Sequence, residues 1–75
     1  MANLTRETAK EYTLQHLTDL GYEDIVITGA IAIKIIGCPP QVTVGFTFCC
    51  DESESGVYRG SMDVWLEGGK LRGEW

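Results

Sequence analysis

Residues that commonly perform catalysis are scarce in this chain. It has one histidine, His16, and three cysteines that show no C-x-x-C spacing. The sequence also lacks a glycine-rich phosphate loop, a Ser-His-Asp set and any cluster with metal-ligand spacing. His16 falls on the apolar stripe of a predicted helix, where a histidine is more often a boundary residue than a catalyst. The sequence therefore predicts a protein that is not an enzyme and that needs no cofactor and no metal.

Positive charge is scarce as well. Lys and Arg number 6 against 11 Asp and Glu, which gives a formal net charge of -5. A protein that binds the phosphate backbone directly needs a positive surface that releases counterions. We therefore expect no direct contact with nucleic acid, and a partner protein with a basic surface fits the charge better.

Long hydrophobic segments are missing too. The longest one, residues 25–36, is interrupted by Thr28, Gly29 and Lys34 and is too short to span a bilayer. No signal peptide opens the chain, and the odd number of cysteines agrees with a reducing compartment. These features predict a cytoplasmic protein without membrane contact, and 75 residues leave room for a single domain over residues 1–75.

The sequence does contain a clear succession of helical and strand periods. Thr5 is a good helix N-cap, Gly21 is a good helix terminator, and apolar residues recur at helical spacing between them. Period-two patterns follow, and they are separated by turn signals. The predicted elements are a helix at about 5–20 and strands at about 24–36, 41–50, 57–67 and 70–75. We expect an α+β fold in which one N-terminal amphipathic helix packs on a four-stranded antiparallel β-meander.

The strand register is predicted from the apolar faces. If Ile36 pairs with Gln41, the odd-numbered isoleucines of the first strand face the helix together with the apolar residues of the second strand. The opposed residues of the second strand are then Val42, Val44 and Phe46. Gly29 becomes a bend within one long strand, although a hairpin at this point is an alternative. The last hairpin pairs Leu66 with Leu71 across a two-glycine turn.

The stretch TFCCDESESG, residues 47–56, combines two adjacent cysteines with an acidic loop. Cys38 lies at one end of the second strand and Cys49 and Cys50 lie at the other, roughly 35 Å away at 3.3 Å per residue. This separation excludes a shared disulfide or zinc site. The acidic half imitates the start of a calcium loop, but Met62 occupies the position that requires glutamate. We expect ordinary reduced thiols and a solvated loop.

An acidic pole at one end of the predicted sheet is the first candidate binding surface. Its residues are Glu23, Asp24, Asp51, Glu52 and Glu54. Such a pole could imitate nucleic-acid phosphates toward a basic groove on another protein, or it could only confer solubility.

The open sheet face, the side of the sheet that the single helix does not cover, is the second candidate. Its candidate contact residues are Trp65, Arg72, Lys34, Asp63 and Glu74. The predicted register places Lys34, Thr43, Trp65 and Arg72 in one cross-strand row. Trp and Arg are favoured interface anchors, so this face suits a partner protein or a homodimer. Alternatively, Arg72 and Lys34 only shield the indole.

Asp63 and Glu74 face each other across the last hairpin. Paired carboxylates can perform acid-base chemistry when a pocket shifts the pKa of one of them. On an open sheet we expect a mildly repulsive surface pair instead.

The helix-then-meander plan resembles cystatin-like and related small α+β modules in architecture. The small size, the acidity, the flat open face and the lack of catalytic groups also resemble the small inhibitors that phages and mobile elements encode, including anti-CRISPR proteins. The resemblance implies an inhibitor that occludes a host nucleic-acid-handling complex. Two alternatives stay open: a thiol-dependent or small-ligand-binding protein that uses Cys49, Cys50 or His16, and a structural homo-oligomer subunit.

Overall fold

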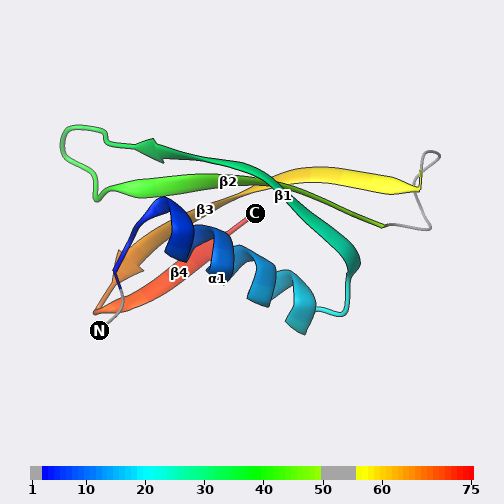
Figure 1. The fold of residues 1–75 in the computed structure, drawn as a ribbon. Helices are drawn as coiled ribbons and strands as arrows, with labels where there is room; N and C mark the ends of the chain where they lie inside the picture. The colour runs from blue at the N-terminus through cyan, green and yellow to red at the C-terminus, as the bar shows by residue number, and fades with distance from the viewer. Residues whose placement is uncertain (1–2, 50–55) are drawn as a thin grey trace.

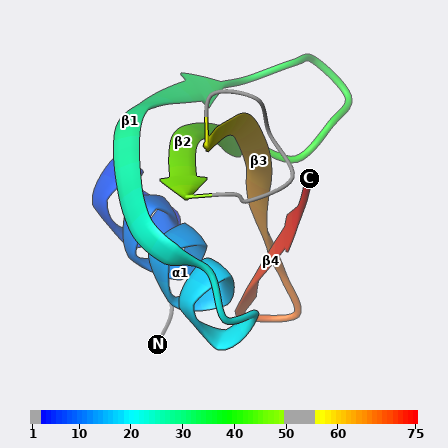
Figure 2. The same ribbon diagram turned by 90° about the vertical axis from the view of Figure 1, so that its right-hand side faces the viewer.

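The computed structural model describes residues 3–49 and 56–75 as one helix and a four-stranded sheet (Figure 1). The elements are α1 (Arg6–Asp19), β1 (Glu23–Ile33), β2 (Gln41–Cys49), β3 (Val57–Glu67) and β4 (Lys70–Glu74). The strands are antiparallel neighbours in the order β1-β2-β3-β4, and α1 lies against one side of the twisted sheet (Figure 2). The predicted α+β fold, with one helix packed on an antiparallel meander, is confirmed.

Local capping determines where α1 begins and ends. The hydroxyl oxygen of Thr5 accepts a hydrogen bond from the backbone N–H of Thr8 at 3.1 Å, and the Thr8 hydroxyl accepts one from the backbone N–H of Thr5 at 2.8 Å. This reciprocal pair is a capping box. Gly21 follows the helix with a φ of 91°, which glycine adopts without steric cost. Both predicted helix ends are confirmed.

The hydrophobic core lies between α1 and the sheet. The two central strands supply most of it, because every second residue of β2 and two residues of β3 point toward the helix. The core residues are Ala9, Leu17, Val42, Val44, Phe46, Phe48, Met62 and Val64. The Thr13 hydroxyl, which is also fully buried, donates a hydrogen bond to the Ala9 carbonyl at 2.9 Å. Full burial of a large apolar side chain contributes about 1.5–3 kcal/mol, so these contacts fix α1 on this side of the sheet.

The predicted register of the first strand is wrong. β1 ends at Ile33, and Ile33, not Ile36, pairs with Gln41. The small residues Ala30 and Ala32 therefore take the helix-facing positions opposite β2. The isoleucine between them, Ile31, turns outward and is 66% exposed.

A β-bulge explains the difference. The register shifts between Ile27 and Gly29, so Thr28 is an extra residue that reverses the alternation of side chains along β1. Ile25 and Ile27, before the bulge, pack against the core. After the bulge the isoleucines lie on the opposite side of the sheet. The irregularity expected at Gly29 is present. It is a β-bulge that moves the side chains of the following residues to the other face of the sheet within one strand.

Residues 34–40 form a longer connection than the predicted tight turn. Ile35 and Ile36 are 54% and 102% exposed, and Gly37 adopts a φ of 85°. Pro39 and Pro40 have no N–H to donate to a strand partner, so pairing resumes only at residue 41.

The register between β2 and β3 also differs from the prediction. Trp65 pairs with Gln41, two residues from the expected Thr43. A shift of two residues leaves each side chain on the same face, so alternation alone cannot detect it. The β3–β4 hairpin agrees with the prediction, because Leu66 pairs with Leu71.

Candidate protein-binding face

The open sheet face is formed by alternate residues of β2, β3 and β4 that point away from α1. The strand pairing arranges them in cross-strand rows. The first row contains Gln41, Trp65 and Arg72, the second contains Thr43, Asp63 and Glu74, and the third contains Gly45 and Ser61. Trp65 and Arg72 are neighbours, and so are Asp63 and Glu74, as the sequence predicts.

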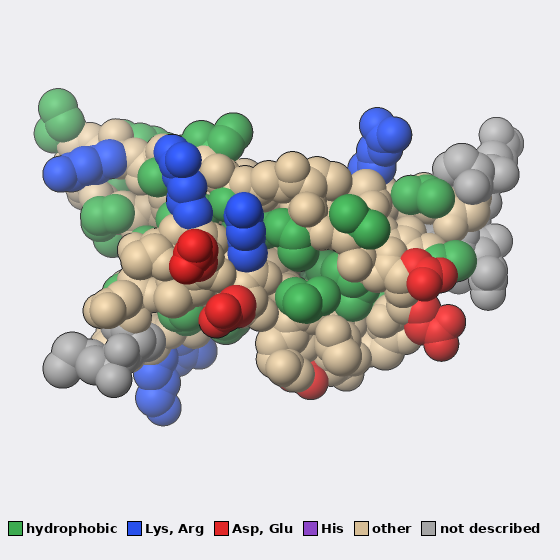
Figure 3. Space-filling view, viewed as in Figure 1, with side chains coloured by type: hydrophobic (Ala, Val, Ile, Leu, Met, Phe, Trp, Pro, Cys, Tyr) green, Lys and Arg blue, Asp and Glu red, His purple; other side chains and the backbone are tan. Residues whose placement is uncertain are grey.

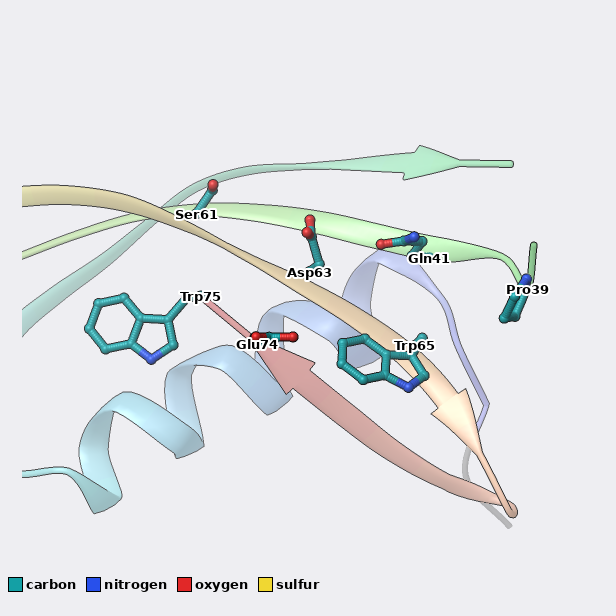
Figure 4. A pocket seen from close by; sticks show the side chains of 7 residues that line it. All are labelled: Pro39, Gln41, Ser61, Asp63, Trp65, Glu74 and Trp75. Carbon is teal, nitrogen blue, oxygen red and sulfur yellow. The ribbon is translucent and has the colours of Figure 1, made fainter. Parts of the chain in front are cut away.

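A hollow of about 590 Å³ opens on this face (Figure 4). It is lined by Pro39, Gln41, Ser61, Asp63, Trp65, Glu74 and Trp75. In the view of Figure 4, the Glu74 side chain lies between the indole rings of Trp65 and Trp75. The hollow thus combines two tryptophans with two carboxylates, and both carboxylates were among the residues expected on this face.

Trp65 is half-buried and held by a local hydrogen bond. Its indole Nε1 donates to a carboxylate oxygen of Glu67 at 3.3 Å. Lys34 lies beyond the end of β1, so the expected row of Lys34, Thr43 and Trp65 does not form. Within the described residues, neither Lys34 nor Arg72 makes a cation–π contact with the indole. The alternative in which both cations shield the Trp65 ring therefore has no support in this geometry.

Asp63 and Glu74 occupy directly opposed positions on β3 and β4. The Thr43 hydroxyl donates a hydrogen bond to Asp63 Oδ1 at 2.7 Å, which orients this carboxylate. Neither carboxylate forms a salt bridge with a cation of residues 3–49 or 56–75. Like charges directly opposite each other destabilise a strand pair. A cation bound between these two carboxylates on the open face would therefore reduce the repulsion between them.

The acidic pole is only partly described. Glu23 and Asp24 are exposed at the start of β1, and Glu23 pairs with Cys49 at one end of the sheet. Asp24 has a φ of 53°, a conformation that is uncommon for non-glycine residues but tolerated by Asp. Figure 3 shows acidic side chains gathered at the right-hand end of the molecule in this view. The remaining residues of the pole, Asp51, Glu52 and Glu54, lie outside the described residues.

Within the described residues, no hydrogen bond joins Cys38, Cys49 or His16 to one another. Cys38 and Cys49 are exposed free cysteines, and Cys50 and most of the calcium-like stretch lie outside the described residues. The His16 ring stacks on Tyr12, with ring centroids 6.1 Å apart. Within the described part of the chain, no group of three His, Cys, Asp or Glu residues could hold a metal ion.

The isoleucines of β1 that follow the bulge form one apolar feature that the sequence pattern did not predict. Ile31 stands in the row of Thr43 and Asp63, and Ile33 stands in the row of Gln41 and Trp65. Ile31 therefore adds an exposed apolar side chain to the open sheet face. Only the bulge at Thr28 places it there, and a glycine inside a strand pattern is the one signal of such a bulge.

An aromatic cluster lies on the helix side of the sheet, and the sequence indicates only the position of Trp75 in it. Tyr22 stacks on Phe48 with centroids 4.0 Å apart, Phe48 stacks on Tyr58 at 4.9 Å, and Trp75 contacts Phe46 edge-on at 5.2 Å. Tyr22, Tyr58 and Trp75 are each about 36–45% exposed. The Leu66–Leu71 register already indicates that Trp75 lies near the helix-facing residues of β3, because it sets the alternation along β4.

Comparison with known proteins gave no match to a protein-family model, a curated protein or a solved structure. No helix within the described residues is long and apolar enough to cross a membrane. A fold of this kind does not by itself assign a function, so the function has to be inferred from the geometry of the open sheet face.

Proposed function

We propose that this chain is a small protein-binding module that covers a basic surface of another protein. The observation that carries the proposal is the hollow on the open sheet face, where Trp65 lies beside the unneutralised carboxylates of Asp63 and Glu74. Pockets of this size at a surface suit the insertion of a partner's side chain. Tryptophan is among the residues that contribute most to binding at protein interfaces.

Exposed apolar side chains outside the hollow also support a protein partner. Ile31 is 66% exposed on the open sheet face, and Ile36, in the β1–β2 connection, is fully exposed. Interfaces combine an apolar centre with a polar rim. The isoleucines, Trp65 and the carboxylates together have that composition, and Arg72 beside Trp65 adds a side chain favoured at interfaces.

Charge indicates what kind of partner fits. The chain has a formal net charge of -5, so its field attracts a basic protein surface and repels nucleic acid. Glu23 and Asp24, exposed at the start of β1, add local negative charge that would attract such a partner. Steric and electrostatic occlusion of this kind is the mode of action we propose, as in inhibitors that phages and mobile elements direct against host nucleic-acid-handling complexes.

A capture experiment tests the proposal. Immobilised wild-type chain, the Trp65→Ala variant and a Leu14→Ala control are incubated with lysate of the source cell at low and high salt. Leu14 is 43% exposed on α1, on the other side of the molecule, so its truncation removes exposed apolar surface without touching the proposed site. We expect wild type and Leu14→Ala to retain the same basic protein at low salt, and Trp65→Ala to bind it at least about tenfold more weakly.

Two outcomes would contradict the proposal. Equal capture by Trp65→Ala and wild type would exclude the open sheet face as the binding surface. Recovery of only further copies of the chain would favour a structural homo-oligomer. A Cys49→Ser variant in the same experiment tests the thiol-dependent alternative, which predicts that this substitution abolishes function while the fold persists.

A further inference from the structure

We infer that the hollow on the open sheet face receives a basic side chain of the partner, and that an arginine guanidinium fits it best. The inference rests on the proposed function and specifies the chemical group that the site recognises. It follows from the placement of Trp65, Asp63 and Glu74, and from the lack of a salt bridge between either carboxylate and a cation of the described residues.

The two carboxylates both offer acceptor oxygens to the hollow, but only that of Asp63 is held by a hydrogen bond. Asp63 is fixed by the hydrogen bond from Thr43 to its Oδ1, which leaves Oδ2 without a partner within the described residues. Glu74, directly opposite, makes no side-chain hydrogen bond to any described residue. A cation placed between them would gain two attractive interactions and would relieve their mutual repulsion.

The indole of Trp65 adds a second preference for a cation. An aromatic ring attracts a cation to its face, and tryptophan does so most strongly. The Glu67 carboxylate, which accepts the indole N–H at 3.3 Å, holds the ring in place from its edge. Within the described residues neither Arg72 nor Lys34 makes a cation–π contact with this ring, so neither competes with a partner's cation for it.

The lining also distinguishes among possible ligands. Two carboxylates repel a phosphate or another anion. Within the described residues no three potential ligands are grouped for a metal ion, which favours an organic cation. A guanidinium is planar, stacks on an indole and donates paired hydrogen bonds to a carboxylate, whereas an ammonium is a compact, strongly hydrated charge. The side chains of Gln41 and Ser61 at the rim can accept the remaining N–H groups.

An NMR titration with a short peptide tests the inference directly. The probe is acetyl-Gly-Arg-Gly-amide, and the matched control peptide carries citrulline, which has nearly the same shape without the charge. The chain has two tryptophans, so the Trp65 Nε1–H resonance can be assigned with a Trp65→Phe variant. We expect the arginine peptide to shift the Trp65 resonance saturably in the millimolar range and the citrulline peptide to leave it unchanged.

Carboxylate variants show whether Asp63 and Glu74 recognise the positive charge of the arginine peptide. In Asp63→Asn the side-chain oxygen can still accept the Thr43 hydrogen bond, and Glu74→Gln removes no hydrogen bond of the described structure, so both variants should keep the fold. The double variant should bind the arginine peptide about fivefold more weakly than wild type. If the double variant folds poorly, Glu74→Gln alone replaces it in the titration. This single variant should also bind the arginine peptide more weakly than wild type.

The outcomes separate this inference from the proposed function. Equal shifts with arginine and citrulline, or no shift with either peptide, would overturn the basic side chain as the ligand, even if Trp65→Ala still abolished capture of the partner. Conversely, full capture by Trp65→Ala would overturn the proposed function whatever the peptide does.

Discussion

Single glycines at the sheet illustrate how closely the helix and the strands are packed. A β-carbon added at Gly73 would lie 2.6 Å from a ring carbon of Tyr12 and 2.8 Å from the sulfur of Met62. Met62 is fully buried and cannot move aside without disturbing the core. At Gly29 no atom lies within 4 Å of the same position, and the backbone there is not in the left-handed region. The two glycines therefore serve different purposes, since only Gly73 is required for space.

Gly73→Ala should destabilise the protein by roughly 1–3 kcal/mol, the usual cost of overpacking a core. This loss outweighs the roughly 0.5–1 kcal/mol that replacing a strand glycine can gain. Gly29→Ala should change the free energy of unfolding by no more than about 0.5 kcal/mol. Urea denaturation followed by circular dichroism gives both values, and equal stability of the two variants would show that the space at Gly73 is not limiting.

The helix, the hairpins and the strand registers differ in how far local sequence determines them. The ends of α1 and the β3–β4 hairpin are predictable because Thr5, Gly21 and the Gly68-Gly69 turn act over a few residues. The register of β1 is not, because its isoleucines alternate equally well on either side of the sheet and the bulge at Thr28 decides between them.

The candidate site also has a part that local sequence determines and a part that depends on the strand registers. The hairpin places Trp65 beside Arg72 and Asp63 beside Glu74, so these neighbours could be predicted. Lys34 could not be placed, because its position depends on the register of β1. The hollow itself could not be foreseen either, since Gln41 reaches Trp65 only through a two-residue shift of β2 against β3 that alternation does not reveal.

Thr5→Ala tests the capping box at the scale of the helix. The substitution removes the acceptor for the Thr8 N–H, so it should lower the free energy of unfolding by about 1 kcal/mol. Thr18→Ala is the matched control, because Thr18 is exposed near the other end of α1 and its hydroxyl only bonds back to the Leu14 carbonyl. Alanine favours the helix there, so this variant should be as stable as wild type or slightly more stable. A loss for Thr18→Ala as large as that for Thr5→Ala would argue against a specific cap.

The molecule as a whole has two unlike sides. α1 and the core occupy one side of the sheet, whereas the open sheet face carries Trp65, the paired carboxylates and an exposed isoleucine on the other. The structure measures 40 × 23 × 16 Å along its principal axes. Its broad side is thus comparable with the roughly 800 Å² that each partner buries in an interface of standard size. A protein interface of standard size therefore fits within the dimensions of this molecule.

Mapping the interface on the complex shows whether the open sheet face binds the partner. The captured partner, once purified, is added to the isotope-labelled chain, and backbone amide and indole NMR shifts are followed residue by residue. We expect the largest changes on the open sheet face, at Gln41, Thr43, Asp63, Trp65 and Glu74, while the exposed residues of α1 stay unchanged. Changes concentrated on α1, or on the aromatic cluster around Tyr22 and Tyr58 with the open sheet face unaffected, would contradict this expectation.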